Sequence, residues 1–398
     1  PAMAQMFGYE TPEEMIDNVK DISRQIYADP GARQQVIDLL DRQEEVSGYE
    51  CQGIRRDGSV FWVSLTACVV RNKDQTISYY QGFVSDITER MEEDELARMR
   101  LRLIDYAADH ALDKLLTRAL DEIGSFMASP IGFYHFVHSD QKTLTLQQWS
   151  TQTLRHHCKA EGKGMHYSID QAGVWVDSVR EGRPVIHNDY PSIPHKKGIP
   201  EGHATVTREL VVPVWRKGKI VAIVGVGNKP QDYTEQDSHN LEFLADITHE
   251  IVMRKHSEEA LRRSENYYRT VFETTGTLMF IIEEDTTISL ANSKFAELSG
   301  YAKPEIEGKI SWTEFAHPDD VDWMRKYHYL RRQDPNSAPQ QYEFRFITRS
   351  GEKRNVLLNI DIIPETHQSI ASCIDITVQK RTENVLQSRL YLMEYSMT

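Results

Sequence analysis

Alternating apolar and polar positions predict a group of β-strands near the start of the chain. Apolar side chains occupy every second position from Phe61 to Ala67, and Ser64 and Thr66 lie between them, which is the period of a strand with one buried face. Turn signals separate three strand-like stretches, 50–55, 60–70 and 77–85. The pattern predicts a three-stranded antiparallel meander.

A similar pattern returns near the other end of the chain, with an additional front half. The strand-like stretches there are 278–283, 287–291, 342–348, 353–363 and 369–374. A helical stretch at 293–299 follows the second of these, and Asn292 before it is a candidate helix cap or a residue facing a ligand pocket. The two ends of the chain are therefore predicted to carry the same kind of domain.

The middle of the chain, residues 110–252, mixes helices and strands in a different order. An amphipathic helix is predicted at 112–126 and a closing helix at 236–254. Strand-like stretches lie between them, at 131–137, 143–149, 210–215 and 220–227. The whole chain is therefore expected to have an α+β fold, with antiparallel sheets flanked by helices.

Two charged helical stretches repeat each other. Residues 375–398 repeat residues 86–109 without a gap, beginning with Asp-Ile-Thr in both copies, which signals a modular array. A narrow apolar seam runs along each copy: Ala97, Leu101, Ile104 and Ala108 in the first, and Leu386, Leu390, Met393 and Met397 in the second. Such a seam fits either a dimeric coiled coil or a helix docked on its own domain.

The Asp-Ile-Thr motif lies where the last strand of a domain becomes a connector helix. Asp or Thr can cap the free N–H groups of a first helical turn, and a carboxylate there interacts favourably with the helix dipole. The motif is therefore expected to link the position of the sheet to the position of the helix.

Composition limits the classes of function. The net charge of -14 argues against nucleic acid as a partner, because phosphate binding needs clustered Lys and Arg. No stretch is long and apolar enough to span a membrane, and no signal peptide is visible. The 4 cysteines form no CxxC pair, which fits a reducing cytoplasm.

Both terminal blocks resemble PAS domains. The resemblance is carried by Gly-Tyr-x-x-Pro-Glu at 8–13 and 300–305, His-Pro-Asp-Asp at 317–320, the Ser-Gly turn at 350–351 and the terminal Asp-Ile-Thr. Residues 264–273 are similar to the usual opening helix of the family. The first block lacks the opening strands, so the chain is expected to be a piece of a longer protein.

The middle block resembles GAF domains, through Asn228-Lys229, Tyr233 and Asp237 before the closing helix. Its segments around Cys158 and His203 are similar to GAF domains of certain archaeal sensor kinases, which carry haem attached through one cysteine. That resemblance implies haem as cofactor, with Cys158 at the thioether position and His203 as the proximal ligand of the iron. The C-x-x-C-H attachment motif is absent, and an unidentified small molecule, or none, is the alternative.

Catalytic motifs are missing from the sequence. Neither GxxxxGK[ST] nor GxGxxG occurs, and no flavin-attaching Asn-Cys-Arg-Phe run is found. The sequence around His249 resembles the phosphoacceptor helix of histidine kinases but lacks the Arg-x-Pro that follows there. No catalytic residue is therefore expected in this chain.

The resemblance implies a sensory region that relays a small-molecule, redox or gas signal. Its parts are a PAS domain at 1–88, a connector helix at 89–109, a GAF domain at 110–252, a connector at 253–263, a PAS domain at 264–377, and a connector at 378–398 leading to a further GAF domain. A homodimer through the connectors, and an output domain of the same protein, are the expected partners. The output is expected to be a histidine kinase of a two-component phosphorelay; alternatives are a diguanylate cyclase, a transcription activator, or a ligand-free dimerisation scaffold.

Overall fold

The computed structural model describes residues 1–157, 166–170, 172–194 and 205–395. Residue contacts divide the chain into two compact units, Pro1–Ser257 and Glu258–Thr398. Antiparallel sheets flanked by helices build both, so the expected α+β fold is confirmed. Among the described residues, no helix combines the length and apolar character needed to cross a bilayer.

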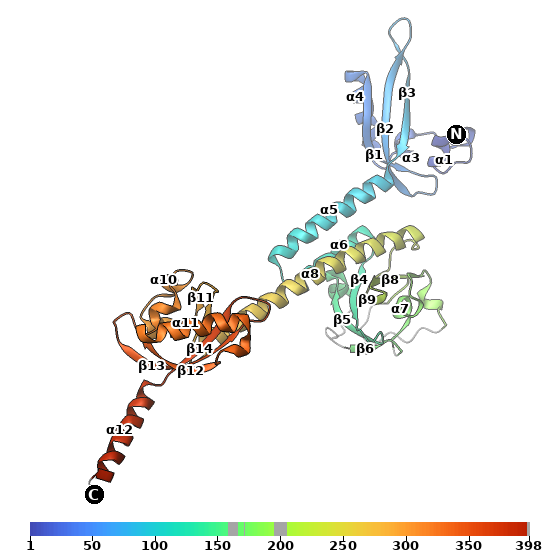
Figure 1. The fold of residues 1–398 in the computed structure, drawn as a ribbon. Coiled ribbons are helices and arrows are strands. Elements are labelled where there is room, and N and C mark those ends of the chain that lie inside the picture. The colour runs from blue at the N-terminus through green and yellow to red at the C-terminus, as the bar shows by residue number, and fades with distance from the viewer. Residues whose placement is uncertain (158–165, 171, 195–204, 396–398) are drawn as a thin grey trace. The chain divides into compact units, whose positions relative to one another are not determined.

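The N-terminal domain is a three-stranded antiparallel meander in the order β1-β2-β3, with short helices beside it (Figure 1). Its elements are α1 (Ala2–Met6), α2 (Pro12–Asn18), α3 (Ile22–Gln25), α4 (Pro30–Gln43), β1 (Glu45–Ile54), β2 (Val60–Arg71) and β3 (Ile77–Asp86). Phe61 and Val63 are buried together with Phe7, so the alternation in β2 selects the core face as predicted.

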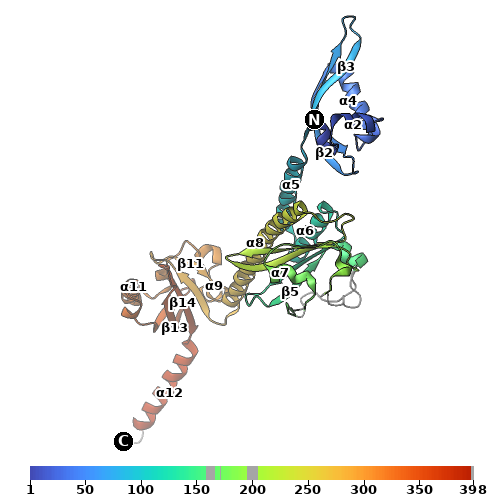
Figure 2. The same cartoon turned by 90° about the vertical axis from the view of Figure 1, so that its right-hand side faces the viewer.

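The middle domain is a six-stranded sheet in the order β6-β5-β4-β9-β8-β7. Its elements are α6 (Leu112–Phe126), β4 (Ile131–Val137), β5 (Thr143–Trp149), η1 (Thr153–His157), β6 (His166–Ser168), η2 (Val174–Val176), α7 (Asp177–Glu181), β7 (Val185–His187), η3 (Tyr190–Ser192), β8 (Glu209–Arg216) and β9 (Lys219–Gly227). Helices α6 and α8 (Glu235–Thr274) cover one face of the sheet (Figure 2), where Tyr134 and Val224 are buried in the main core.

Helix α5 (Thr88–Asp109) has two apolar faces. Leu96, Met99 and Leu103 are buried in the core of the middle domain, so one face of α5 is docked on that domain. Of the seam named from the sequence, Ile104 is partly buried against this core, whereas Leu101 is 67% exposed and Ala97 is exposed as well. The part of the seam around Leu101 thus remains exposed after α5 has docked.

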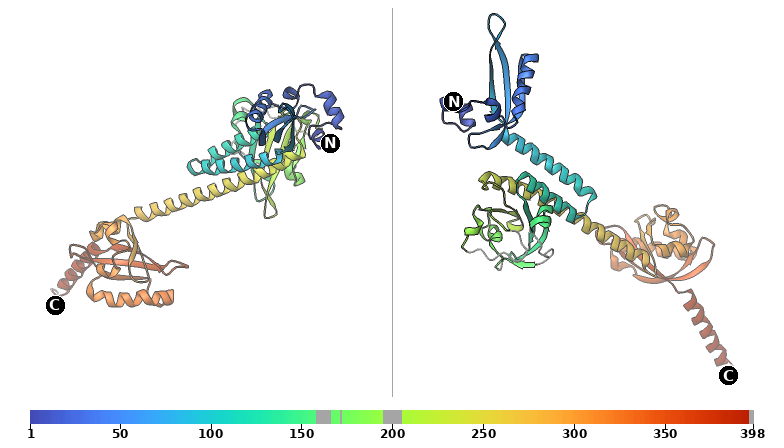
Figure 3. Two further views of the ribbon diagram at one scale, coloured as in Figure 1. Left: turned by 90° about the horizontal axis from the view of Figure 1, so that it is seen from above. Right: turned by 180° about the vertical axis from the view of Figure 1, so that it is seen from behind.

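Helix α8 runs without interruption from Glu235 to Thr274 (Figure 3). The sequence pattern predicts three separate elements here: a closing helix, a connector and an opening helix. The structure joins them into one helix because the segment contains neither Gly nor Pro, the residues that most strongly end a helix.

The C-terminal domain is a five-stranded antiparallel sheet in the order β11-β10-β14-β13-β12. Its elements are β10 (Leu278–Ile282), β11 (Ile288–Ala291), α9 (Ser293–Ser299), α10 (Lys303–Ile306), η4 (Trp312–Phe315), α11 (Pro318–Gln333), η5 (Pro335–Ser337), β12 (Gln341–Ile347), β13 (Lys353–Ile362), β14 (Ser369–Asp375) and α12 (Thr377–Tyr395). The aromatic side chains of Phe295, Phe315 and Phe346 meet in its core.

Candidate functional site

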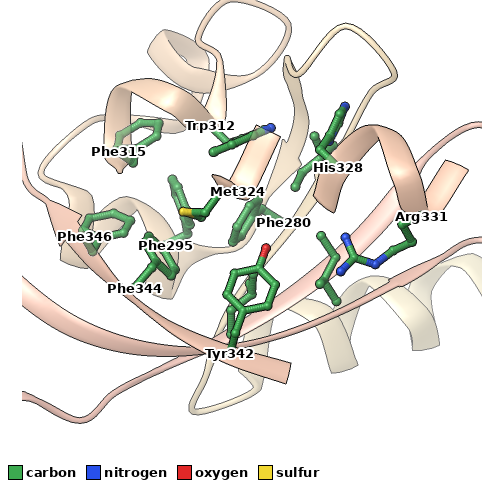
Figure 4. Close-up of a pocket in the computed structure, with 13 residues that line it drawn as sticks. Phe280, Phe295, Trp312, Phe315, Met324, His328, Arg331, Tyr342, Phe344 and Phe346 are labelled. Carbon is green, nitrogen blue, oxygen red and sulfur yellow. The ribbon is translucent and has the colours of Figure 1, made fainter. Parts of the chain in front are cut away.

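The C-terminal domain contains a cavity of about 30 Å³ between its sheet and the segment formed by η4 and α11. Most of its wall is apolar, with Phe280, Phe295 and Phe344 among the lining side chains (Figure 4). An apolar pocket with a few convergent polar groups is the usual form of a small-molecule site.

Four polar side chains line this cavity: Arg331 and His328 of α11, Trp312 of η4 and Tyr342 of β12. The Arg331 side chain is completely buried, and its Nη2 donates a hydrogen bond to the carbonyl of Pro339. Within the described part of the chain, Nε and Nη1 of Arg331 and Nε1 of Trp312 are buried without a partner. Burial raises the pKa of Tyr342 to about 12, and the Arg331 charge opposes this rise, so the hydroxyl keeps its proton at neutral pH.

His328 also lines the cavity, but both of its ring nitrogens are engaged. Nε2 lies 3.0 Å from the carbonyl of Glu284, and Nδ1 lies 3.0 Å from Nη1 of Arg332. Burial lowers the pKa of His328 to about 4, so the ring is neutral, with Nε2–H donating and Nδ1 accepting. His328 therefore holds α11 against the segment that follows the C-terminal end of β10.

The position of α11 is fixed by the His-Pro-Asp-Asp motif. The His317 side chain accepts a hydrogen bond from the N–H of Asp319 and caps the helix. Nη2 of Arg345 on β12 lies 2.7 Å from Oδ1 of the buried Asp320. The hydrogen bonds from Arg345 lower the pKa of Asp320 although burial acts to raise it. One cavity wall is thus tied to the sheet by an ion pair.

The Asp-Ile-Thr motif forms the same joint in both terminal domains. In the second copy, the N–H of Thr377 donates to Asp375 (2.9 Å), while the Thr377 hydroxyl accepts from the N–H of Asn355 on β13 (2.9 Å). In the first copy, Thr88 makes the equivalent bonds with Asp86 (2.9 Å) and with Trp62 on β2 (3.0 Å). The prediction that this motif links helix to sheet is confirmed.

Asn292 is completely buried and acts as a helix cap, the first of the two roles considered for it. Its Oδ1 accepts from the N–H of Phe295 at the start of α9 (3.0 Å), and its Nδ2 donates to the carbonyls of Phe272 (3.0 Å) and Thr277 (2.9 Å). It therefore holds the end of α8 against the sheet and does not face the cavity.

The middle domain offers a second candidate site, on the sheet face opposite α6. There His135 is buried beside Phe133 and Trp175, with its ring centroid 4.7 Å from that of Trp175. Burial lowers the pKa of His135 to about 3, and its Nδ1 has no partner within the described ranges. His135 is therefore a neutral, buried imidazole packed among aromatic rings of this sheet face.

Cys158 and His203, the residues singled out for haem, lie outside the described residues. Among the described histidines of this domain is His187, whose Nδ1 lies 2.8 Å from Oε1 of Glu209 on β8. The Glu209 hydrogen bond raises the pKa of His187, and burial raises the pKa of Glu209. Over the described ranges, no group of three or more His, Cys, Asp or Glu side chains is placed to hold a metal ion.

Other residues named from the sequence have structural partners. Nζ of Lys229 lies 2.7 Å from Oδ1 of Asp237, and the hydroxyls of Tyr233 and Ser129 are 2.7 Å apart. His249 is buried, with Nδ1 2.6 Å from the Tyr134 hydroxyl, which is the environment of a core residue and not of an exposed phosphoacceptor.

The polar residues of the cavity were missed by the sequence analysis. A signal was present: Met324, His328 and Arg331 follow the spacing of one helical face in 318–333, so a cation falls on the apolar stripe. The partners Trp312 and Tyr342 belong to separate elements, and no local pattern joins them to Arg331.

Comparison with known proteins assigns a family to each domain. The PAS domain family matches residues 1–89, the GAF domain family matches residues 109–252, and the PAS fold family matches residues 266–374. The "Methyl sulfide methyltransferase-associated sensor" of Methanosarcina acetivorans is 32% identical over 269 residues, which are 66% of this chain and 26% of that protein. The chain thus spans about a quarter of the length of this relative.

Two solved structures resemble single domains. The PAS domain of an HTR-like protein from Haloarcula marismortui is 21% identical, with a TM-score of 0.25, and the match covers 31% of this chain and 99% of that one. The GAF domain of a phosphoenolpyruvate-protein phosphotransferase from Acinetobacter is 17% identical, with a TM-score of 0.35, and covers 42% and 95%. Three family matches in tandem show that residues 1–89 and 266–374 belong to the PAS families and residues 109–252 to the GAF family, so the chain is a PAS–GAF–PAS sensory region.

Proposed function

We propose that this region binds a small molecule in the cavity of the C-terminal PAS domain and passes the effect through α12 to an output domain of the same protein, a histidine kinase. A ligand can transmit a signal only by binding two arrangements of the protein with different affinity. The proposal therefore needs a structural element that the cavity and the helix share.

Strand β13 is that shared element and carries the proposal. Leu358 and Ile360 on β13 line the cavity, and Asn355 on the same strand donates to the Thr377 hydroxyl at the start of α12. A displacement of β13 by an occupant of the cavity would therefore reach the first turn of α12 through a hydrogen bond, without an intervening loop.

We further infer a homodimer through the connector helices. The seam of α5 keeps Leu101 and Ala97 exposed after Leu103 has docked in the GAF core. On α12, Leu386 is also exposed. Parallel packing of two copies of such seams is the coiled-coil arrangement.

The GAF domain is proposed to carry haem, with Cys158 as the attachment site and His203 as the iron ligand. Support comes from the family resemblance and from the aromatic sheet face around His135. Haem would supply redox or gas-binding chemistry there. Purified protein with a Soret band that survives denaturation in the wild type, but not in Cys158→Ala, would support the attachment, and a colourless protein after haem reconstitution would contradict it.

The relay is tested by a substitution that fills the cavity with a larger side chain. Ile360→Phe places a ring in the cavity, and Asn359→Phe, on the exposed face of the same strand, is the matched control. We expect Ile360→Phe to change amide hydrogen exchange in residues 377–389, and the change to shrink in the Thr377→Val background. Unaltered exchange in α12 of Ile360→Phe, with altered exchange in β13, would contradict the relay.

The output is tested in the full-length protein. Incubation with labelled ATP is expected to form a phosphohistidine whose level differs between wild type and Ile360→Phe. Formation of a cyclic dinucleotide from GTP would show that the output domain is a diguanylate cyclase and not a kinase. Sequence-specific DNA binding would show that it is a transcription activator. A full-length protein whose output ignores Ile360→Phe would favour the scaffold.

A further inference from the structure

Arg331 is a buried cation without a carboxylate. Its side chain has no exposed surface, and no ion pair joins it to any acidic residue in the described part of the chain. Transfer of an unpaired charge into a protein interior is costly, and proteins normally offset it with a counter-charge. The Pro339 carbonyl engages one nitrogen of the guanidinium, and two nitrogens are left.

The adjacent Arg332 shows what a purely structural arginine looks like in this helix. Its Nε donates to the carbonyl of His367 (3.0 Å), Nη1 to that of His328 (2.9 Å) and Nη2 to that of Glu283 (3.1 Å). All three nitrogens of Arg332 are thus used to hold backbone, whereas Arg331 extends toward the interior of the domain (Figure 4).

The free polar atoms of the cavity are donors. Nε and Nη1 of Arg331 carry only hydrogens to donate, and so does Nε1 of Trp312. The hydroxyl of Tyr342, which keeps its proton, can donate as well and points into the same cavity (Figure 4). A cation surrounded by neutral donors selects an anion, and a guanidinium fits a planar carboxylate best.

The size and the wall of the cavity restrict the anion further. About 10–15 Å³ on this measure holds one water, so the cavity of about 30 Å³ has room for only a few non-hydrogen atoms. Apart from His328, whose ring nitrogens are engaged, the rest of the wall is formed by apolar rings and aliphatic chains such as Phe280 and Ile360, which match a methyl group and not further charge. A long-chain fatty acid exceeds this space, and an inorganic oxyanion leaves the apolar wall unmatched.

We propose that the C-terminal PAS cavity is a receptor site for a short-chain monocarboxylate of the size of acetate, with the carboxylate on Arg331 and the alkyl end against the aromatic wall. The inference rests on the proposed ligand-binding function of this cavity and names the class of ligand.

The test measures binding to this chain by isothermal titration calorimetry and by thermal shift after exhaustive dialysis into carboxylate-free buffer. The probes are the sodium salts of formate, acetate, propionate, butyrate and octanoate, with chloride and nitrate at equal ionic strength. We expect saturable binding and an increased Tm with acetate or propionate, weaker effects with butyrate, and none with octanoate or chloride. A response to nitrate equal to that to acetate would show an unspecific oxyanion site and overturn the proposal.

Two variants connect the response to the cavity. Arg331→Gln should weaken acetate binding at least about tenfold, or 1.4 kcal/mol, whereas Arg325→Gln on the exposed face of the same helix should leave it unchanged. Because Arg331→Gln could unfold the domain, Ile360→Ala provides a second readout: the enlarged cavity should shift the preference from acetate toward butyrate. No binding of any carboxylate, the result expected if water alone fills the cavity, would overturn the proposal.

The failure of this inference differs from the failure of the relay. If no carboxylate binds but Ile360→Phe still alters exchange in α12, only the ligand class is wrong. If acetate binds through Arg331 and exchange in residues 377–389 does not respond, the ligand class stands and the relay is wrong.

Discussion

The Thr377 hydroxyl accepts a hydrogen bond from the backbone N–H of Asn355 at 2.9 Å, which ties the first residue of α12 to the strand beside it. The same bond, from Trp62 to Thr88, recurs at the start of α5. An ion pair accompanies each copy, Arg354–Asp375 at 3.2 Å and Arg55–Asp86 at 2.9 Å. The repeated Asp-Ile-Thr motif thus forms the same hydrogen-bonded connection between strand and helix in both domains.

Thr377→Val tests the contribution of this joint. Valine has the same shape but no acceptor, so the change leaves the N–H of Asn355 without its partner in a partly buried position. We expect the free energy of unfolding of the C-terminal domain to fall by about 1–3 kcal/mol. Urea unfolding followed by circular dichroism measures this loss.

The control is Thr382→Val on the exposed part of the same helix, where the hydroxyl donates only to the Val378 carbonyl. Its effect should stay within about 0.5 kcal/mol. Equal losses in the two variants would mean that the bond to β13 contributes nothing particular.

Acid should loosen the link between α11 and β12. The folded-state pKa of Asp320 lies below the ordinary aspartate value, mainly because Arg345 donates to it. The ionised Asp320 carboxylate therefore contributes its full share of the free energy of unfolding above the unfolded pKa of about 3.9. This contribution is lost as pH falls through the lower folded pKa. Because Arg345 is partly exposed, we expect the loss in the free energy of unfolding to be only about 1 kcal/mol.

Unfolding midpoints of the C-terminal domain, measured at about pH 5 and pH 3, check this prediction. Asp320→Asn should reduce the difference between the two midpoints, whereas Asp322→Asn, an exposed neighbour on α11, should leave it unchanged. A wild-type difference that survives in Asp320→Asn would assign the acid sensitivity to another carboxyl group.

The GAF domain should lose stability as pH rises above the ordinary pKa of histidine, about 6.5. Glu209 raises the pKa of His187 above its ordinary value of about 6.5. The ion pair between His187 and Glu209 therefore stabilises the fold fully below the unfolded pKa of His187. This stabilisation disappears as pH rises through the folded pKa of His187, because the buried Glu209 then loses its cationic partner. Calorimetric melts across this range should show a falling Tm in the wild type and a flatter profile in His187→Gln. The exposed His239→Gln is the control, and a slope that is unchanged in His187→Gln would reject the assignment.

Much of the fold could be predicted because the sequence marks it locally. The stretches 131–137 and 143–149 coincide with β4 and β5, since clear apolar runs and a turn delimit them. By contrast, β6 and β7 are three residues long, too short to show a period, and pairing with longer neighbours creates them. The joint at Thr377 was predictable because cap and motif are adjacent in sequence.

The cavity could not be predicted in the same way. An arginine in a helix normally marks an exposed face, and Arg331 is buried only because η4, α11 and β12 enclose it together. The same holds for Leu103 and Leu101, which are both apolar positions of α5 but take opposite environments once the GAF core forms on one side.

Substitutions of these two leucines test whether the buried face of α5 stabilises the GAF domain and the exposed face mediates self-association. Leu103 is buried in the GAF core, so Leu103→Ala should cost about 2–5 kcal/mol of unfolding free energy. Leu101 is exposed, so Leu101→Ala should change the unfolding free energy of a monomer by no more than about 0.5 kcal/mol. Leu101→Glu should instead weaken self-association in sedimentation velocity, because like charges would face each other across a parallel seam. If Leu101→Glu sediments as the wild type does over the same concentrations, the seam on α5 is not a dimer contact.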